Sequence, residues 1–335
     1  MLKNLLSFVS ALTLLLAVAS CDNEIDLLED YKEIPVIYGL IDPGSNTHYV
    51  RVQKAWLGEG NALVMGQQSD SIYYAQDDIK LTLEKLQTGS NAVITSEQFL
   101  PTTDFPKQEG LFTEQGHYVF KLSTTNALDP DNSYRLRFEN LKTGKVVTAN
   151  TRIIYPIVFN AFNNSVKVNL ANINPYQIRF GSPKWGRVFG LIMRIKYNEI
   201  DSISLNIRQR SIDYTLKNIN SLSVNGGEDM IFFLKGEEIF RYMGAVIGPP
   251  QGAYKRILSS FKADYLFTCG TDDLYNYIQI NSPNNVVNYI PTFTNLSDGR
   301  GLFTCRYTTR VNDVSFNDLT LDSILNGRYT SVIFR

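Results

Sequence analysis

Apolar residues alternate with polar ones along much of this chain, in the pattern of strands that bury one face. Every second position is apolar from Ile79 to Leu83 and again from Tyr134 to Phe138. A period of two places these side chains on one face of a strand. By similar patterns, further strands are predicted at 36–41, 49–54, 118–122, 146–154, 166–170, 177–180, 188–197, 202–215 and 261–269. The stretch 57–76 shows little periodicity and predicts a long loop.

One corner in the first half has a more specific pattern. Leu128 and Pro130 precede Tyr134, which begins an alternating run. This spacing is similar to the Leu-x-Pro-x-x-x-Tyr corner of fibronectin type III and immunoglobulin-like sandwiches, whose Tyr hydroxyl bonds the backbone. A calcium-binding EF-hand does not fit, because Tyr134 and Asn140 stand where that loop needs Gly and Glu. We therefore predict a β-sandwich domain of about seven short strands over residues 34–154.

The second half adds helical patterns to its strands. Residues 236–247 have acids in the first turn, apolar positions at 239, 243 and 246, and a Gly-Pro-Pro stop. Residues 271–278 begin with a capping Thr and two acids, and 317–325 predicts a third short helix. We place the domain boundary at Tyr155-Pro156 and predict a β-rich α+β domain with two or three short helices over 155–335.

The first twenty residues carry the signals of export. Lys3 gives a positive start, residues 5–19 are predominantly apolar, and small residues lead directly into Cys21. That order is typical of a secretory signal peptide, and the apolar run is shorter than the roughly 20 residues of a transmembrane helix. A cysteine at the cleavage site indicates a lipoprotein. We therefore predict a signal peptide at 1–20, a diacylglycerol on the thiol of Cys21, and an acidic tether over 21–33.

The composition of the mature chain limits its partners. Cleavage removes Lys3 alone from the charged residues, so 31 basic side chains remain against 33 acidic ones, a net charge of −2. This balance argues against nucleic acid and against a polybasic membrane surface. The remaining 315 residues exceed the usual size of one domain, which agrees with two. The 19 Tyr and 19 Phe favour strands.

Two further cysteines, Cys269 and Cys305, each end a Leu-Phe-Thr-Cys segment. An exported protein meets an oxidising compartment, which allows a disulfide between them. The bridge would stabilise the fold by about 3–4 kcal/mol in the chain-entropy model. Alternatively, the two are buried free thiols that behave as small hydrophobic side chains. The sequence leaves both interpretations open.

Motifs of catalysis and metal binding are missing from the sequence. His48 and His117 lie 69 positions apart, and neither has a Cys, Asp or Glu at ligand spacing. No Gly-x-Ser-x-Gly elbow, phosphate loop or dinucleotide fingerprint occurs. The paired acids Glu237-Glu238 and Asp272-Asp273 fall in the first turns of predicted helices, where the helix dipole explains them. We predict no catalytic residue, no cofactor and no bound metal.

The triplet Asp-Ser-Ile occurs three times, with its serine at positions 71, 202 and 323. It resembles the Asp-Ser/Thr-apolar acceptor of the general protein O-glycosylation of Bacteroidetes. Ser71 and Ser202 are therefore candidate acceptors. Ser323 falls inside a predicted helix, where plain burial or solvent exposure is the expected outcome.

Several segments together resemble a large family of Bacteroidetes lipoproteins of unknown function. The resemblance implies an outer-membrane address, a gene often beside a TonB-dependent transporter, and no catalytic residue. Arg300 replaces one Gly of the family pattern, and Cys305 falls where the family often has Ser. The matching segments are Cys21 with 34–40, 134–136 with 144–145, 240–247, 274–278 and 291–303.

These observations leave three functions, in order of support. The first is a lipid-anchored protein of the outer membrane that binds a ligand or partner as an accessory to a nutrient transporter. Exposure at the cell surface is suggested by Asp22, Glu24 and Asp26, which are similar to export signals in this phylum. The second is a structural or adhesive component of the cell surface. The third, with least support, is an enzyme that acts on glycans. The ligand stays unknown.

Overall fold

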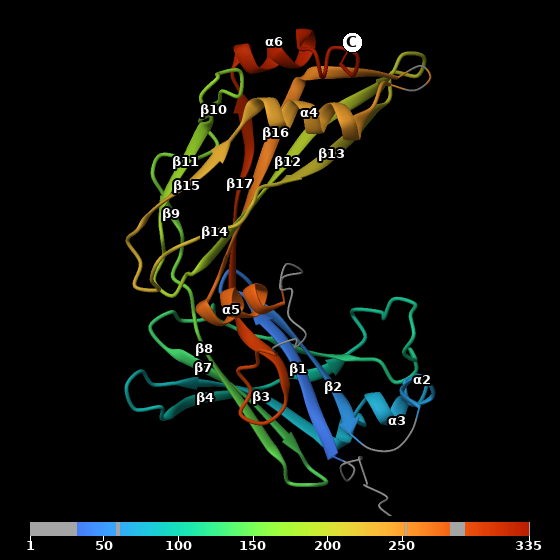
Figure 1. Cartoon of the computed structure of the whole chain (residues 1–335), viewed down its shortest axis with the longest axis vertical. Helices are drawn as coiled ribbons and strands as arrows, with labels where there is room; N and C mark the ends of the chain where they lie inside the picture. Colours follow the sequence, from blue (N-terminus) through green and yellow to red (C-terminus); the bar gives the residue numbers. More distant parts are fainter. Residues whose placement is uncertain (1–31, 58–60, 251, 253, 282–291, 335) are drawn as a thin grey trace, which may run out of the picture.

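The computed structural model describes residues 32–57, 61–250, 252, 254–281 and 292–334. Strands account for 45% of the chain and helices for 14%, which confirms the prediction of a mainly β protein. Two bodies stack along the long axis (Figure 1). The lower body contains strands β1 to β8 with the short helices α2 and α3. The upper body contains β9 to β16 with α4 and α6, while α5 lies where the two bodies meet.

The lower body is a sandwich of two four-stranded arrangements, confirming the predicted immunoglobulin-like fold. One layer is the β1-β2-β6-β5 part of a ten-stranded sheet, and the other is the four-stranded sheet β4-β3-β7-β8. These orders match strands A-B-E-D and C′-C-F-G of immunoglobulin domains. The strands are β1 (Lys32–Ile41), β2 (Thr47–Leu57), β3 (Ile79–Leu86), β4 (Val93–Gln98), β5 (Leu100–Thr102), β6 (Val119–Ser123), β7 (Ser133–Asn140) and β8 (Val146–Arg152).

The predicted tyrosine corner is present at the start of β7. The side chain of Tyr134 is buried, and its hydroxyl accepts a hydrogen bond from the backbone N–H of Asp129 at 3.0 Å. Leu136 and Phe138, two and four residues further along β7, are buried in the same core. The corner therefore ties the β6–β7 connection to the sandwich, as its sequence pattern predicts.

A single strand, β17 (Arg300–Phe316), belongs to both bodies. Its first part, Arg300 to Cys305, pairs in parallel with β1, and Arg306 to Ser315 pairs antiparallel with β16. Just before it, Leu296 forms a bridge with Ala149 of β8. The sandwich thus includes a C-terminal strand in addition to residues 34–154, while the proposed division at Tyr155-Pro156 falls just after β8.

The upper body contains the other part of the ten-stranded sheet, with the long strands in the order β13-β12-β16-β17 and the short strands β10 and β14 paired to β17 and β12. A smaller sheet, β15-β11-β9, packs on it through aromatic rings: Phe180 lies 5.4 Å from Phe189 and 6.4 Å from Phe267 between centroids. The strands are β9 (Val158–Phe159), β10 (Lys167–Val168), β11 (Tyr176–Gly181), β12 (Val188–Asp201), β13 (Ile207–Thr215), β14 (Ile219–Asn220), β15 (Asp229–Leu234) and β16 (Tyr254–Gly270).

Three helices confirm the predicted helical segments. They are α4 (Gly236–Ile247), α5 (Asp272–Ile280) and α6 (Asp318–Asn326). In α4, Ile239 and Met243 are buried as the pattern predicts, but Val246 is half exposed. At the start of α5, the side chain of Thr271 bonds the Thr304 hydroxyl instead of capping the helix. None of the helices in the described ranges has the length and apolar character needed to cross a bilayer.

Two local predictions were wrong. The segment 57–76 is not a continuous loop, because it contains the one-turn helices α2 (Ala62–Met65) and α3 (Ser69–Ile72). The strand predicted over 202–215 begins only at Ile207. The carboxylate of Asp201 accepts the backbone N–H groups of Ile203 and Ser204, at 2.8 and 3.1 Å, and closes a turn there.

Candidate functional site

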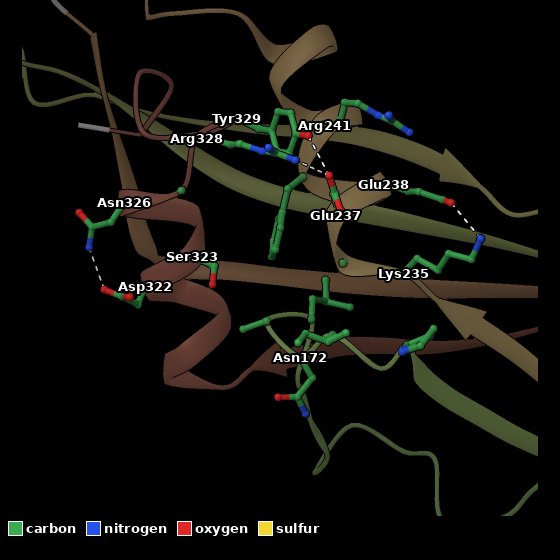
Figure 2. Close-up of a pocket in the computed structure, with 17 residues that line it drawn as sticks. Asn172, Lys235, Glu237, Glu238, Arg241, Asp322, Ser323, Asn326, Arg328 and Tyr329 are labelled. Atoms are coloured by element: carbon green, nitrogen blue, oxygen red, sulfur yellow. Dashed lines mark hydrogen bonds and ion pairs between the residues drawn. The ribbon is translucent and has the colours of Figure 1, made fainter.

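A cleft of about 910 Å³ opens at the upper end of the molecule. Its walls are the first turns of α4, the second half of α6 with the residues that follow it, and the segment 170–175 between β10 and β11 (Figure 2). This volume lies within the range of about 300–1,000 Å³ that small-molecule sites occupy. The cleft is therefore a candidate binding site by its size.

Two glycines of α4 let the walls approach one another. A Cβ at Gly236 would lie 1.7 Å from the carbonyl oxygen of Leu170, and one at Gly244 would lie 2.5 Å from the carbonyl oxygen of Tyr329. On the α6 side, the buried hydroxyl of Thr320 accepts the N–H of Leu170 at 2.8 Å. The cleft is thus fixed by contacts between segments that are distant in sequence.

Glu237 is the most connected side chain in the cleft. Its Oε1 accepts a hydrogen bond from the Tyr329 hydroxyl at 3.0 Å and forms an ion pair with Arg328 (Figure 2). The hydrogen bond from Tyr329 and the charge of Arg328 lower the pKa of Glu237. The Arg328 guanidinium also lies 4.5 Å from the centre of the Tyr329 ring. These contacts keep Glu237 ionised and orient the tyrosine.

The other charged groups in the cleft are largely paired. Lys235 bonds Glu238 at 2.9 Å, and Asn326 donates to the carboxylate of Asp322 at 2.8 Å. Arg241 has no ion-pair partner among the residues that the structure describes. The lining contains three cations (Lys235, Arg241, Arg328) and three anions (Glu237, Glu238, Asp322), so that its formal charge is zero.

The lining offers carboxylate, guanidinium, ammonium, amide and phenol groups, all of which can form hydrogen bonds with a ligand. The lining has neither histidine nor cysteine. Its only serine, Ser323, donates its hydroxyl to the carbonyl oxygen of Leu319 at 2.9 Å. A general acid needs a raised pKa, whereas that of Glu237 is lowered. Across the described ranges, no group of three or more His, Cys, Asp or Glu side chains could hold a metal ion.

Those predicted site residues that the structure describes lie outside the lining of this cleft. Cys21, the proposed lipidation site, lies outside the described residues. Ser71 is half buried on α3, and Ser202 is exposed in the turn between β12 and β13. Only Ser323, the third serine of the repeated triplet, lines the cleft. Of the three, Ser202 is the most accessible to a modifying enzyme.

Cys269 and Cys305 are buried and free in the structure. Cys269 lies opposite Tyr307, so that Cys305 is its diagonal neighbour on β17. Diagonal neighbours are about 7–8 Å apart, which is more than the roughly 4.4–6.8 Å between Cα atoms that a disulfide usually bridges. Burial raises the pKa of both thiols, that of Cys305 to about 12. The disulfide stays a prediction, and the register favours the alternative of two buried thiols.

The two histidines and the pair Asp272-Asp273 lie outside the lining of the cleft, whereas Glu237-Glu238 belongs to it. His48 is buried in the sandwich, and His117 bonds the Phe105 carbonyl oxygen at 3.2 Å. Burial lowers the pKa of both imidazoles. Glu237-Glu238 and Asp272-Asp273 lie in the first turns of α4 and α5 as predicted. Burial raises the pKa of Asp273, whose carboxylate accepts a hydrogen bond from Asn295 at 3.2 Å.

The sequence contains no motif that predicts the cleft. Its tyrosine and its two arginines, Arg241 and Arg328, belong to no recognised motif. The run Arg328-Tyr329 follows a predicted helix, where nothing in the local sequence distinguishes it from a chain end. Only the packing of α4 against Tyr329 shows that these residues face a cavity.

Comparisons with known proteins do not assign this chain to a family. No family model matches the chain, and no curated protein does. Among solved structures, it is similar to the C-terminal globular domain of an oligosaccharyltransferase from Pyrococcus abyssi, with 10% identity over 70% of this chain and 47% of that one, at a TM-score of 0.24. The N-terminal four Ig domains of Dscam1 match with 10% identity over 61% and 52%, at 0.15.

A third match is the BSP domain of a biofilm associated protein, with 9% identity over 83% of this chain and 58% of that one, at a TM-score of 0.16. This chain therefore spans roughly half the length of the solved chains that it matches. Similarities this weak indicate no shared function.

Proposed function

We propose that this protein is a lipid-anchored outer-membrane lipoprotein that binds a neutral, hydroxyl-rich ligand in the cleft between α4 and α6. The observation that carries the ligand class is the balance of three cations and three anions around a tyrosine. A charged ligand would compete with the existing ion pairs. Sugar hydroxyls can instead bond carboxylate, guanidinium and amide groups together, since each hydroxyl both donates and accepts.

The position of the cleft supports a role in capture. Strand β1, which begins at the first described residue, lies in the lower body, and α4 and α6 lie at the upper end of the molecule (Figure 1). A lipid on Cys21 would therefore hold the lower body at the membrane and present the cleft away from it. The resemblance to lipoproteins encoded beside TonB-dependent transporters supports an accessory role in nutrient uptake.

The proposal is tested with the chain from residue 21 carrying Cys21→Ser. Calorimetric titration with neutral oligosaccharides (glucan, xylan and mannan fragments) should show binding that Tyr329→Ala and Arg241→Ala each weaken roughly tenfold. Arg179→Ala is the matched control, because Arg179 is an exposed, ion-paired arginine on β11 outside the cleft. Binding of every probe unchanged by Tyr329→Ala, or no binding at all, contradicts the proposed ligand class.

The proposed outer-membrane location is tested separately in cells. Cys21→Ser should release the protein from the outer-membrane fraction, and protease treatment of intact cells should remove the anchored protein if it faces outward. A variant that still fractionates with the membrane contradicts the lipid anchor. A gene neighbourhood of fimbrial or matrix components, in place of a transporter, would favour the structural or adhesive alternative.

A further inference from the structure

Four apolar side chains project into solvent from two adjacent loops of the lower body. Leu63 and Val64 on α2 are 63% and 58% exposed, and Leu111 and Phe112 on the β5–β6 connection are 70% and 53% exposed. Single exposed apolar residues are ordinary, but a group of large ones on neighbouring loops marks an interaction surface. We call these four residues the apolar loop pair.

Hydrogen bonds hold the two loops against each other. The N–H of Thr113 donates to the carbonyl oxygen of Gly66 at 2.9 Å, and the Gln67 side chain bonds the carbonyl oxygen of Leu111. The Tyr73 hydroxyl donates to the Thr113 carbonyl oxygen at 3.1 Å. The backbone is therefore fixed while the apolar side chains face outward, which gives a preformed surface.

The apolar loop pair lies within reach of the proposed lipid anchor. Lys32 pairs with Leu57 across β1 and β2, and Leu63 follows only six residues later. The Cα atoms of Lys32 and Leu63 are therefore at most about 26 Å apart. The eleven Cα–Cα steps from Cys21 to Lys32 span at most about 40 Å when extended. A bilayer that holds Cys21 therefore lies within one tether length of this end.

We propose that the apolar loop pair inserts into the lipid bilayer beside the anchor. This inference rests on the proposed lipoprotein and adds a second contact that orients the molecule with its cleft away from the membrane. The charges nearby determine the kind of lipid. Glu109 and Glu114 flank Leu111 and Phe112, with Lys107 as the nearest cation in sequence. Such a surface binds zwitterionic lipid through apolar contact and gains nothing from anionic headgroups.

The test uses the chain from residue 21 with Cys21→Ser, so that neither the signal peptide nor a lipid contributes. Flotation with vesicles of phosphatidylcholine and phosphatidylethanolamine should recover this protein with the lipid. Replacing Leu111 and Phe112 by serine should lower the partition coefficient by roughly tenfold or more, because their burial drives insertion. Raising the salt from 0.1 to about 1 M should leave binding unchanged or stronger, since no ion attraction is involved.

The matched control is the double variant Ile203→Ser, Leu205→Ser. These two side chains are 86% and 73% exposed in the turn between β12 and β13, in the upper body. The control should bind vesicles like the parent. A parent chain that does not float, or an equal loss in both double variants, overturns the proposal. Binding to a purified transporter that depends on Leu111 and Phe112, without binding to vesicles, overturns it in favour of a protein partner.

A gain of signal provides an independent measurement. Phe112→Trp places an indole at an exposed site, where it should not disturb folding. Its emission should shift to the blue on addition of vesicles and be quenched by brominated lipid, whereas the parent should change little. An unchanged spectrum contradicts insertion. Because this chain carries no lipid, the result is independent of whether Cys21 is acylated in cells.

Discussion

The lower body and the upper body are each stabilised by a different kind of contact. The lower body is built from hairpins, β1 with β2, β3 with β4 and β7 with β8, and closes its β6–β7 connection with the hydrogen bond from Asp129 to Tyr134. The upper body depends on long strands and on aromatic packing between two sheets. Its cleft joins three segments distant in the sequence. The hairpins and the corner of the sandwich are therefore local features, while the cleft exists only when the whole fold has assembled.

One buried tyrosine in each body allows the two bodies to be compared by the same substitution. The hydroxyl of Tyr134 in the lower body has a backbone partner, whereas that of Tyr265 in the upper body has none among the residues that the structure describes. Both rings are buried, at 5% and 0% exposure. The same substitution should therefore have opposite effects in the two bodies.

Truncating the corner tyrosine should have the largest effect. Tyr134→Ala removes a buried ring and leaves a cavity, which costs about 3–5 kcal/mol in the free energy of unfolding. Denaturant melts of the chain from residue 21, with Cys21→Ser, measure it. The long chain is needed because β17 pairs with β1. A negligible shift of the midpoint would mean that Tyr134 does not support the sandwich.

Tyr134→Phe should have a smaller effect, because the ring stays. The N–H of Asp129 then loses its acceptor, at a cost of about 1–3 kcal/mol. Tyr275→Phe serves as control, since Tyr275 is half buried and its ring lies 4.8 Å from the Arg187 guanidinium, a contact that Phe retains in part. The control should change stability by less than about 0.5 kcal/mol. Equal effects of the two substitutions would show that the corner hydrogen bond contributes nothing.

A loss of stability at acid pH should follow from His48 in the lower body. Burial lowers the pKa of His48 in the folded protein, so the unfolded chain binds more protons once the pH falls below about 6.5. Stability should therefore decrease below that pH, by at most about 1.4 kcal/mol per unit, until the lowered folded pKa is reached. His48→Leu should flatten this part of the profile in denaturant melts between pH 5 and 7. An unchanged slope would assign the effect to other groups.

Tyr265→Phe should have a small effect of the opposite sign. Burying a hydroxyl without a partner costs free energy, so its removal should leave stability unchanged or raise it by about 1 kcal/mol. The same melts decide the outcome. A destabilisation as large as that of Tyr134→Phe would reveal a partner for the Tyr265 hydroxyl and remove the contrast between the two bodies.

The two thiols where β16 and β17 meet should show no labelling in the native protein. Because Cys269 and Cys305 are buried and their pKa values are raised, neither should react with iodoacetamide in the native protein at pH 8. Unfolding in denaturant without a reductant should add two labels by mass. Zero labels under those conditions would establish the disulfide instead.

Much of the secondary structure could be predicted from local sequence. The Leu-x-Pro spacing before Tyr134 specifies a corner, and the acids and apolar positions of 236–247 specify α4, because both signals are complete within about a dozen residues. The turn at Asp201 was missed, since apolar Ile203 and Leu205 continue the strand pattern and only the carboxylate hydrogen bonds interrupt it. Strand β15 and the full length of β17 were also missed.

The cleft could not be predicted in this way. Gly236 and Gly244 look like ordinary helix residues until Leu170 and Tyr329 are seen to pack against them. The ion pair of Glu237 with Arg328 joins positions that are 91 residues apart. Such a pair has no sequence signature, because a Glu or an Arg by itself is typical of any solvent-exposed surface.

The shared strand β17 has a mechanical consequence. A tether that pulls on Lys32 and a ligand that drags on the upper body would draw β1 and β17 in opposite directions along their common axis. Their parallel ladder, from Val36 with Arg300 to Ile41 with Cys305, would then carry the load in shear. In shear, all the hydrogen bonds between β1 and β17 are loaded at once, whereas peeling breaks them one at a time. This ladder therefore resists tension applied between the N-terminal end of β1 and the upper body.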